Sequence, residues 1–186
     1  MDKTEKQKML AGELYRSTDP ELVAERQKAR RLTRLYNSTT EQEDERRVQI
    51  LRELFGKVGS TLEIEPPFYC DYGSNIYAGD GFYMNFGGVI LDCCPVHIGE
   101  KVMCGPSVQI YTATHPTDPE VRLSGLEFAI PVRIGNNVWI GGGAIICPGV
   151  TIGDHTTIAA GSVVVKDIPA RVVAGGNPCR IIRHLE

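Results

Sequence analysis

The stretch IGNNVWIGGGAIICPGVTIGDHTTIAAGSVVV, residues 134–165, has an aliphatic residue at every sixth position, and these residues are Ile134, Ile140, Ile146, Ile152, Ile158 and Val164. A period of six matches neither the alternation of a β-strand nor the turn of an α-helix. A unit of six residues can form a short strand and a corner, with one aliphatic side chain pointing inward. Three units then close a triangular coil, and stacked coils pair their strands in parallel. The period therefore predicts a parallel β-helix, of which hexapeptide repeats are a signature.

The repeat continues upstream of this stretch. Its phase is shared by Ile98, Cys104 and Ile110, and a second column of small or β-branched residues follows four places later: Val102, Val108, Thr114, Val138, Ala144, Val150, Thr156 and Ser162. The same spacing in another phase is kept by Ile64, Cys70, Ile76 and Phe82, so we expect one shift of register between Phe82 and Ile98. A chance spacing in an ordinary β-rich domain is the alternative, and two offset columns argue against it.

The first 56 residues are rich in charge and carry helical patterns. The segment MDKTEKQKMLAGELY predicts a short first helix with Gly12 as its weak point. Thr18 or Asp19, followed by proline, predicts the start of a second helix. We therefore expect residues 1–56 to form a small α-helical N-terminal region.

A third helix is predicted where Thr40 and Glu43 have the spacing of a capping box, and it should run to about Gly56. Beyond it, charges thin out and glycine and β-branched residues become common. We expect residues 57–186 to form the β-helix, interrupted by an excursion loop at residues 115–131 and closed by a C-terminal tail.

The composition indicates a soluble globular protein: of 186 residues, 42% are hydrophobic and 23% charged. A formal net charge of −3 gives no reason to expect nucleic acid or an anionic membrane as partner. The sequence has no membrane-spanning apolar run and no signal peptide at its start, so we expect a cytoplasmic protein. Its six cysteines include no CxxC pair, and we expect reduced thiols.

Several motifs together resemble a known family, the hexapeptide-repeat acyltransferases, which fold as left-handed parallel β-helices. Within it, the sugar O-acetyltransferases, and among them the maltose O-acetyltransferases, are similar to MLAGELYRSTDPEL, EPPFYCDYGSNI, YTATHPTDP, PVRIGNNVWIGGGAIICPGVTIGD and VVAGGNPCRIIR. The segments IGNNVWIG and GNPCR are typical of coenzyme-A-dependent members. The resemblance covers essentially the whole chain. It implies acetyl-CoA as cosubstrate, no metal, an N-terminal region that covers the acceptor, and a homotrimer with active sites between subunits.

His115 is the first candidate for catalysis, because it lies where the repeat breaks, in TATHPTDPEVRLSGLEFAIP. An imidazole titrates near working pH and can take a hydroxyl proton and pass it to a leaving thiolate. The resemblance implies that role of general base. It also matches Asn85, in FYMNFGG, to the active-site asparagine, whose amide can donate to or orient reacting oxygens. Backbone N–H groups of residues 141–143 are further candidate oxyanion donors.

The resemblance also implies a coenzyme A site. Its expected contacts are Gly142, Ala160, Val165, Lys166, Arg180 and Arg183. The three basic side chains carry the charge that the phosphates require. An ordinary basic C-terminal tail is the alternative. Trp139 can line the pantetheine channel or a subunit seam, and plain packing explains it equally well.

On the acceptor side, Asp71 and Asp92 match positions that hold sugar hydroxyls in the resembling family, a task that suits carboxylates. Ser17 and Cys93 stand where the galactoside branch carries acids. This difference favours a maltose-like or glucose-like acceptor and leaves a galactoside acceptor as the alternative.

Two other functions compete. A metal-dependent hydratase shares the β-helix, and His97 and His115 are eighteen residues apart, which would stack them one coil apart. The next coil equivalents are Gly79 and Arg133, which supply no third ligand for a catalytic zinc. A non-catalytic assembly scaffold is the other rival, and the joint presence of His115, Asn85 and the coenzyme A motifs argues against it.

Overall fold

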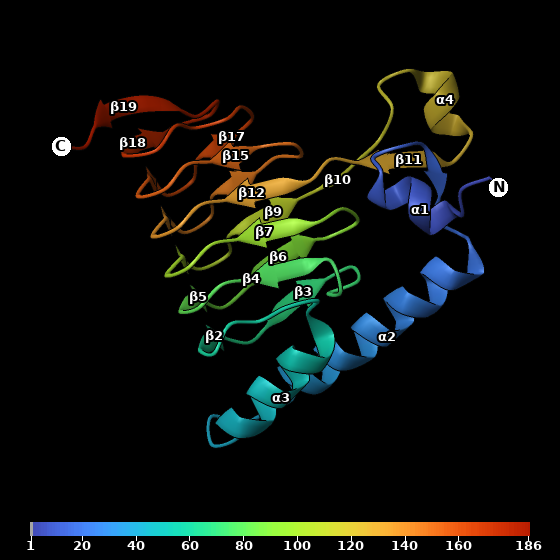
Figure 1. The fold of residues 1–186 in the computed structure, drawn as a ribbon, viewed down its shortest axis with the longest axis horizontal. Helices are drawn as coiled ribbons and strands as arrows, with labels where there is room; N and C mark the ends of the chain where they lie inside the picture. Colours follow the sequence, from blue (N-terminus) through green and yellow to red (C-terminus); the bar gives the residue numbers. More distant parts are fainter. Residues whose placement is uncertain (1) are drawn as a thin grey trace.

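The computed structural model describes residues 2–186 and shows a prism of stacked coils, with two helices at one end and two beside its flank (Figure 1). The helices are α1 (Glu5–Leu10), α2 (Pro20–Asn37), α3 (Asp44–Leu54) and α4 (Pro119–Leu123). A small three-stranded sheet contains β1 (Tyr15–Arg16), β11 (Leu126–Ala129) and β10 (Ala113–Thr114), in that order.

Three larger sheets form the faces of the prism. The four-stranded sheet contains β4 (Ile76–Ala78), β7 (Val96–Ile98), β12 (Val132–Ile134) and β15 (Thr151–Ile152). The five-stranded sheet contains β3 (Phe68–Cys70), β6 (Gly88–Leu91), β9 (Gln109–Tyr111), β14 (Ile145–Ile146) and β17 (Val163–Val164). The seven-stranded sheet contains β2 (Leu62–Ile64), β5 (Phe82–Met84), β8 (Met103–Cys104), β13 (Trp139–Ile140), β16 (Thr157–Ile158), β18 (Val172–Gly175) and β19 (Arg180–His184).

Successive strands of the prism belong to the three sheets in turn, from β2 in the seven-stranded sheet to β3 in the five-stranded and β4 in the four-stranded sheet. The strands of neighbouring coils pair in parallel, as β14 does with both β9 and β17. This arrangement confirms the expected parallel β-helix.

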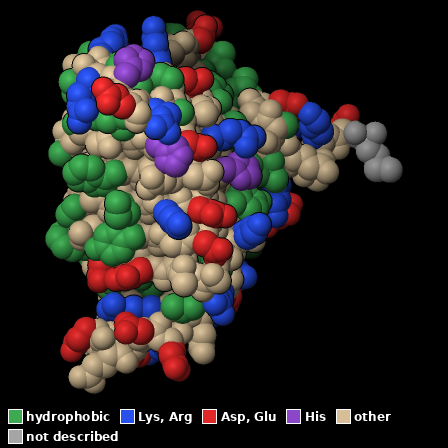
Figure 2. All heavy atoms as spheres, turned by 60° about the vertical axis from the view of Figure 1, so that its left-hand side comes forward, with side chains coloured by type: hydrophobic (Ala, Val, Ile, Leu, Met, Phe, Trp, Pro, Cys, Tyr) green, Lys and Arg blue, Asp and Glu red, His purple; other side chains and the backbone are tan. Residues whose placement is uncertain are grey.

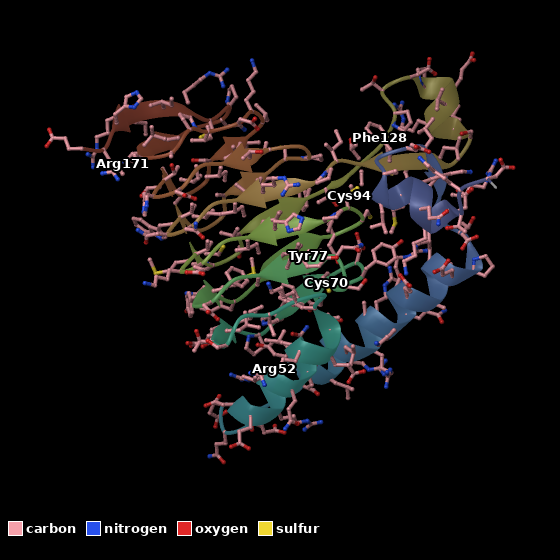
Figure 3. All side chains as sticks on the ribbon, viewed as in Figure 1. Arg52, Cys70, Tyr77, Cys94, Phe128 and Arg171 are labelled. Carbon is pink, nitrogen blue, oxygen red and sulfur yellow. The ribbon has the colours of Figure 1, made fainter. Side chains whose placement is uncertain are left out.

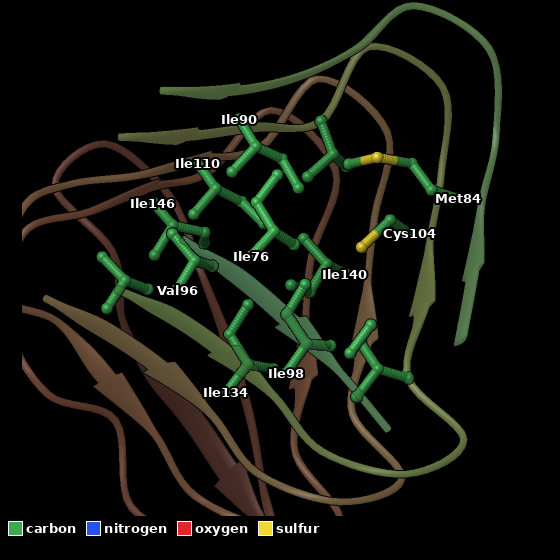
Figure 4. Close-up of a cluster of buried hydrophobic side chains, with 14 of the residues drawn as sticks. Ile76, Met84, Ile90, Val96, Ile98, Cys104, Ile110, Ile134, Ile140 and Ile146 are labelled. Atoms are coloured by element: carbon green, nitrogen blue, oxygen red, sulfur yellow. The ribbon is translucent and has the colours of Figure 1, made fainter. Parts of the chain in front are cut away.

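The aliphatic column fills the interior of the prism (Figure 4). Ile146 is fully buried and lies in register with Ile110 below and Val164 above. Burial of each such side chain contributes about 1.5–3 kcal/mol. The second column is buried too, except that Thr114 is half-buried where the chain leaves the prism. Coils approach closely at the corners: a Cβ on Gly141 would lie 2.4 Å from the backbone nitrogen of Ala160.

The expected single shift of register is wrong, because the structure has two. The inward column passes from Cys70 to Ala78 and again from Ile90 to Ile98, so each of these corners contains two extra residues. Ile76 is buried as well, since it lies two residues before Ala78 on the same strand. Because Ile76 stands six residues after Cys70, the six-residue period continues unbroken in the sequence, and the two extra residues are not detected.

The N-terminal helices begin largely as predicted. Thr4 and Gln7 form a capping box on α1, and Asp19 caps α2. The expected start of the third helix at Thr40 is wrong, since α3 begins at Asp44. The side chain of Glu43 instead accepts hydrogen bonds from the N–H and hydroxyl of Thr40 in the preceding turn. The capping-box spacing therefore marks a turn here.

Helices α2 and α3 close one end of the prism, where Tyr36 and Leu51 share the core with Phe68. The excursion contains α4 and β11, and β11 folds back onto β10, which directly precedes the excursion, as a hairpin. Strand β1 from the N-terminal region pairs with β11 as a third strand. None of the helices within residues 2–186 combines the length and the apolar character needed to cross a bilayer.

Candidate active site

Two edges of the five-stranded sheet carry most of the candidate residues. The glycine edge, which joins it to the seven-stranded sheet, consists of residues 85–87, 105–107, 141–143 and 159–161. The histidine edge, which joins it to the four-stranded sheet, consists of residues 71–75, 92–95, 112–131, 147–150 and 165–167. The two longer corners and the excursion all belong to the histidine edge. This edge is therefore the irregular part of an otherwise regular scaffold, where function is usually found.

Asp92 is fully buried at the histidine edge. One carboxylate oxygen accepts the N–H groups of Asp71, at 3.1 Å, and Tyr72, at 2.9 Å, and the other accepts the N–H of Asn75 at 3.2 Å. Burial raises the pKa of the Asp92 carboxyl to about 7, although the backbone N–H groups counteract the shift. The expected contact between Asp92 and a sugar hydroxyl is thus corrected: its oxygens bind the backbone of residues 71–75, which orders that corner.

Asp71 is half-buried, and its Oδ2 lies 3.5 Å from the Sγ of Cys93. Burial raises the pKa of the Asp71 carboxyl above its usual range, while the Cys93 thiol and Arg26 act to lower it. Burial likewise raises the pKa of the Cys93 thiol well above its usual value. The Asp71 side chain is therefore the acidic group of this corner that remains accessible to an acceptor.

His115 is exposed directly after β10, with 61% of its side chain accessible. Its Nε2 lies 4.0 Å from Oε2 of Glu127, on the returning strand β11. The hydroxyl of Tyr15 donates to the other oxygen of Glu127 at 2.8 Å. Neither Glu127 nor Tyr15 is apparent from the sequence, because their proximity depends on how the excursion folds back onto the N-terminal region.

Arg26 extends from α2 toward the same corner. One guanidinium nitrogen donates to the hydroxyl of Tyr72 at 2.7 Å, and the other donates to the backbone oxygen of Ser17 at 2.7 Å. The guanidinium carbon also lies 5.6 Å from the centre of the Tyr72 ring. The structure therefore brings half-buried Ser17 to the histidine edge through its backbone, together with Arg26 and Tyr72, which the sequence did not single out.

Six thiols are free, and two of them, Cys93 and Cys94, are adjacent in the chain at the histidine edge. The Sγ of Cys94 lies 3.0 Å from the backbone oxygen of Met9. Its Sγ also lies 3.5 Å from the backbone oxygen of Ala129 on β11, and Figure 3 shows Cys94 on the side of the prism that faces α1. Cys94 therefore packs the N-terminal region against the prism.

The glycine edge contains Asn85 and Gly142. Asn85 is half-buried, and its Oδ1 accepts the N–H of Phe86 at 2.8 Å, which leaves the amide nitrogen to donate elsewhere. Of the three glycine N–H groups, those of Gly141 and Gly143 bond to neighbouring coils. The N–H of Gly142 has no hydrogen-bond partner within residues 2–186. Only one of the three expected oxyanion donors is thus available.

The other expected coenzyme A residues are solvent-exposed. Trp139 is 54% exposed on the seven-stranded sheet beside Met103, which is 49% exposed, and Ala160 lies at the glycine edge. Arg180 and Arg183 lie on β19. Val165 and Lys166 follow β17, at the histidine edge. The expected cofactor residues are therefore divided among the two edges and the seven-stranded sheet.

His97 lies away from both edges and does not stack on His115, as the hydratase alternative would need. Its register partners on the four-stranded sheet are Tyr77 and Arg133, because the excursion separates His115 from the regular coil. The His97 and Tyr77 rings stack at 5.0 Å, and both residues line a shallow groove of about 630 Å³. Within residues 2–186 no three His, Cys, Asp or Glu side chains are grouped as for a metal ion.

The surface in Figure 2 carries basic and acidic side chains intermixed, with no large area of one sign on that face. The structure thus groups Asp71, Cys93 and His115 at one edge and Asn85 and Gly142 at the other. The four-residue strand β6, about 13 Å long, separates the two edges within one chain.

Comparison with known proteins identifies the family of this fold. A family model for the maltose acetyltransferase hexapeptide capping motif matches residues 8–59, and one for the bacterial transferase hexapeptide (six repeats) matches residues 131–166. The crystal structure of a maltose O-acetyltransferase from Clostridium difficile 630 has a TM-score of 0.98 and 54% identity, covering 99% of this chain and 98% of that one.

Two further matches carry information on ligand and activity. A hexapeptide-repeat acetyltransferase from Vibrio cholerae O1 biovar eltor, solved in complex with acetyl coenzyme A, has a TM-score of 0.92 and 40% identity, covering 99% of this chain and 100% of that one. The galactoside O-acetyltransferase of Escherichia coli K12 is 42% identical over 179 residues, 96% of this chain and 88% of that protein. The chain therefore belongs to the hexapeptide-repeat sugar O-acetyltransferase family and is an acetyl-CoA-dependent enzyme.

Proposed function

We propose that the protein transfers an acetyl group directly from acetyl-CoA to a hydroxyl of a small maltose-like or glucose-like sugar, with His115 as general base. The observation that carries the proposal is the placement of His115 and Asp71 on one edge, where the regular coil is interrupted and Arg26 of α2 donates to Tyr72. The exposed imidazole can meet a substrate hydroxyl there, and the half-buried carboxylate can accept hydrogen bonds from neighbouring hydroxyls.

In the proposed reaction the imidazole takes the proton of the acceptor hydroxyl as its oxygen attacks the thioester carbonyl. The carbon–oxygen bond forms, the carbon–sulfur bond breaks, and the imidazolium gives the proton to the thiolate of coenzyme A. The amide nitrogen of Asn85 and the free N–H of Gly142 are suited to hold the oxyanion of the tetrahedral intermediate.

Acetyl-CoA is proposed to lie along the glycine edge. Trp139 would then lie beside its pantetheine, and the backbone of Gly142 and Ala160 would contact it. The exposed Lys166, Arg180 and Arg183 would hold its phosphates, and Val165 would contact it at the histidine edge. This placement leaves the acceptor near His115 and the thioester near Asn85.

The two halves of the site are on opposite edges of one chain, so we propose a homotrimer in which one subunit's histidine edge faces its neighbour's glycine edge. The outer face of the five-stranded sheet supports this assembly, because it presents Tyr69, Val89, Ile145 and Val163 to solvent in the single chain. Tyr69 is 53% exposed and lies in register with Val89 on this face, and exposed apolar side chains that lie together mark interaction sites.

The acids at this corner support a maltose-like acceptor. Asp71 is the accessible acid, whereas Ser17 and Cys93 stand where the galactoside branch carries acids. A galactoside remains the second candidate acceptor. We also propose a reducing, cytoplasmic location, which the six free thiols support.

The test is release of coenzyme A thiol from acetyl-CoA in the presence of maltose, glucose or a galactoside, with identification of the product. His115→Ala should lower kcat by about 10²–10⁴ and leave the Kd of acetyl-CoA nearly unchanged, because the ring acts in proton transfer and lies outside the proposed cofactor groove.

Near-normal turnover by His115→Ala would remove His115 from the role of base. Absence of turnover with every sugar, together with absence of acetyl-CoA binding, would favour the non-catalytic scaffold instead. Stoichiometric zinc in the purified protein would reopen the hydratase alternative.

A further inference from the structure

Three side chains form one row across the small three-stranded sheet. Tyr15 on β1 lies directly opposite Glu127 on β11. On the other side, β10 pairs Thr114 with Phe128, so the antiparallel register places the next residue, His115, opposite Glu127. Residues directly opposite one another in an antiparallel sheet point to the same face. Tyr15, Glu127 and His115 therefore share a face, and Glu127 is the middle member.

The contacts along this row run from the core to the surface. Tyr15 is fully buried, the Glu127 side chain is 23% exposed and the His115 side chain 61%. The Tyr15 hydroxyl donates to Oε1 of Glu127 at 2.8 Å, which fixes one carboxylate oxygen. The other oxygen, Oε2, faces Nε2 of His115 at 4.0 Å. The hydrogen bond from Tyr15 thus fixes the Glu127 carboxylate, and its other oxygen faces the imidazole of His115.

We propose that Glu127 and Tyr15 are positioning residues for His115, and this inference rests on the proposed role of His115 as base. A carboxylate beside one ring nitrogen favours the proton on that nitrogen and leaves the opposite nitrogen free to accept the hydroxyl proton. The same carboxylate balances the positive charge that the ring gains during transfer. Glu127 neither takes nor releases a proton, which passes from hydroxyl to imidazole to thiolate.

The separation of 4.0 Å is longer than a hydrogen bond. Catalytic hydrogen bonds are often long in unliganded enzymes and shorten when substrate binds. His115 is exposed and can rotate toward the carboxylate, whereas Glu127 is held by Tyr15. The imidazole therefore moves, and the fixed carboxylate determines its final position.

The row gives the N-terminal region a part in catalysis as well as in covering the acceptor. Tyr15 belongs to a buried cluster with Met9, Leu22, Cys94 and Ala129, which joins the N-terminal segment to the prism and the excursion. Its hydroxyl is the hydrogen-bond donor that reaches Glu127 from this cluster.

Glu127→Gln tests the carboxylate with little change of shape. The glutamine oxygen can still accept the Tyr15 hydroxyl, while the charge facing His115 is lost. We expect kcat to fall about 10- to 100-fold with the KM of acetyl-CoA and the Tm unchanged. Glu120→Gln, at an exposed acid of α4 in the same excursion, is the matched control and should behave as wild type.

Tyr15→Phe removes only the hydroxyl, and we expect a smaller fall in kcat, about 3- to 10-fold. Because Tyr15 acts through Glu127, the double variant Tyr15→Phe/Glu127→Gln should be no slower than Glu127→Gln alone.

Wild-type kcat in Glu127→Gln would overturn the inference, as would a loss confined to Tm or to the KM of acetyl-CoA, which would indicate a purely structural role. If the fall in kcat of the double variant equals the product of the two single falls, Tyr15 does not act through Glu127. Full activity of His115→Ala would instead overturn the proposed base itself, so the two failures are distinguishable.

Discussion

Asp92 and Asp71 illustrate how two neighbouring carboxylates of one corner can have different tasks. The Asp92 carboxylate receives three backbone N–H groups of residues 71–75 and is closed to solvent, whereas Asp71 remains half-buried beside Cys93. We infer that Asp92 holds the backbone from which the Asp71 side chain projects. A substitution of Asp92 should therefore change acceptor binding indirectly, through the position of the Asp71 side chain.

Asp92→Asn should raise the acceptor KM roughly tenfold, because an amide NH₂ replaces one accepting oxygen and faces a backbone N–H. The KM of acetyl-CoA should stay constant in steady-state assays. The matched control is Asp80→Asn, since Asp80 also accepts a backbone N–H, from Ser60, but at another corner of the prism. Equal effects of both substitutions on the acceptor KM would contradict this account.

The raised pKa of the Asp71 carboxyl predicts a pH dependence of acceptor binding. If the carboxylate form accepts hydrogen bonds from the sugar, protonation weakens binding. Because burial moves the pKa upward from its usual value, the acceptor KM should rise as the pH falls, and the rise should begin at a higher pH than an ordinary Asp carboxyl would give. Asp71→Asn should show a high acceptor KM that does not change over this range, measured against a constant KM for acetyl-CoA.

Among the elements, the short strands of the prism have one inward and one outward aliphatic residue, and β14 shows both. Ile146 is fully buried in the interior column, while Ile145 is half-buried on the outer face of the five-stranded sheet. Because the two residues are adjacent and chemically identical, substitutions at them distinguish packing inside the coil from contacts made by its outer face.

Ile146→Asp should prevent soluble folding, because an unpaired charge in the interior costs a large share of a total stability of about 5–15 kcal/mol. Ile145→Asp should fold with β-rich circular dichroism and fail to form trimers in light scattering. Soluble native-like trimers of Ile146→Asp would show that the assigned register is incorrect.

The coil itself could be predicted from sequence, because one inward side chain per strand produces the six-residue period directly. The length of the corners could not be, since Ile76 and Ala78 point to the same side and conceal the two extra residues. His115 and Asp71 could be identified through their motifs. Glu127 could not, because its position opposite His115 depends on the return of the excursion as a hairpin.

At the scale of the whole molecule, His115 and Asn85 lie on opposite edges of one sheet, so the proposed homotrimer forms each proposed site from two chains. Equal amounts of His115→Ala and Asn85→Ala subunits, each inactive alone, should regain activity after unfolding and joint refolding. Random assembly gives roughly one quarter of the interfaces an intact histidine and an intact asparagine. Recovery should therefore approach that fraction of wild-type kcat.

Mixing without unfolding is the control, since intact trimers should not exchange subunits and activity should stay low. No recovery in the refolded mixture, with hybrid trimers present by mass spectrometry, would mean that each chain carries a complete site.

The two ends of the solenoid are closed in different ways, and this has a consequence for self-association. Strand β19 runs antiparallel to β18, although the preceding pairs of that sheet are parallel, and its exposed side chains include Arg180, Arg183 and His184. The opposite end is covered by α2 and α3. A stack of parallel coils would otherwise offer a template on which further molecules could polymerise into fibres. With a reversed, cationic last strand and a helical base, growth along the axis is blocked, and copies are directed to meet flank to flank.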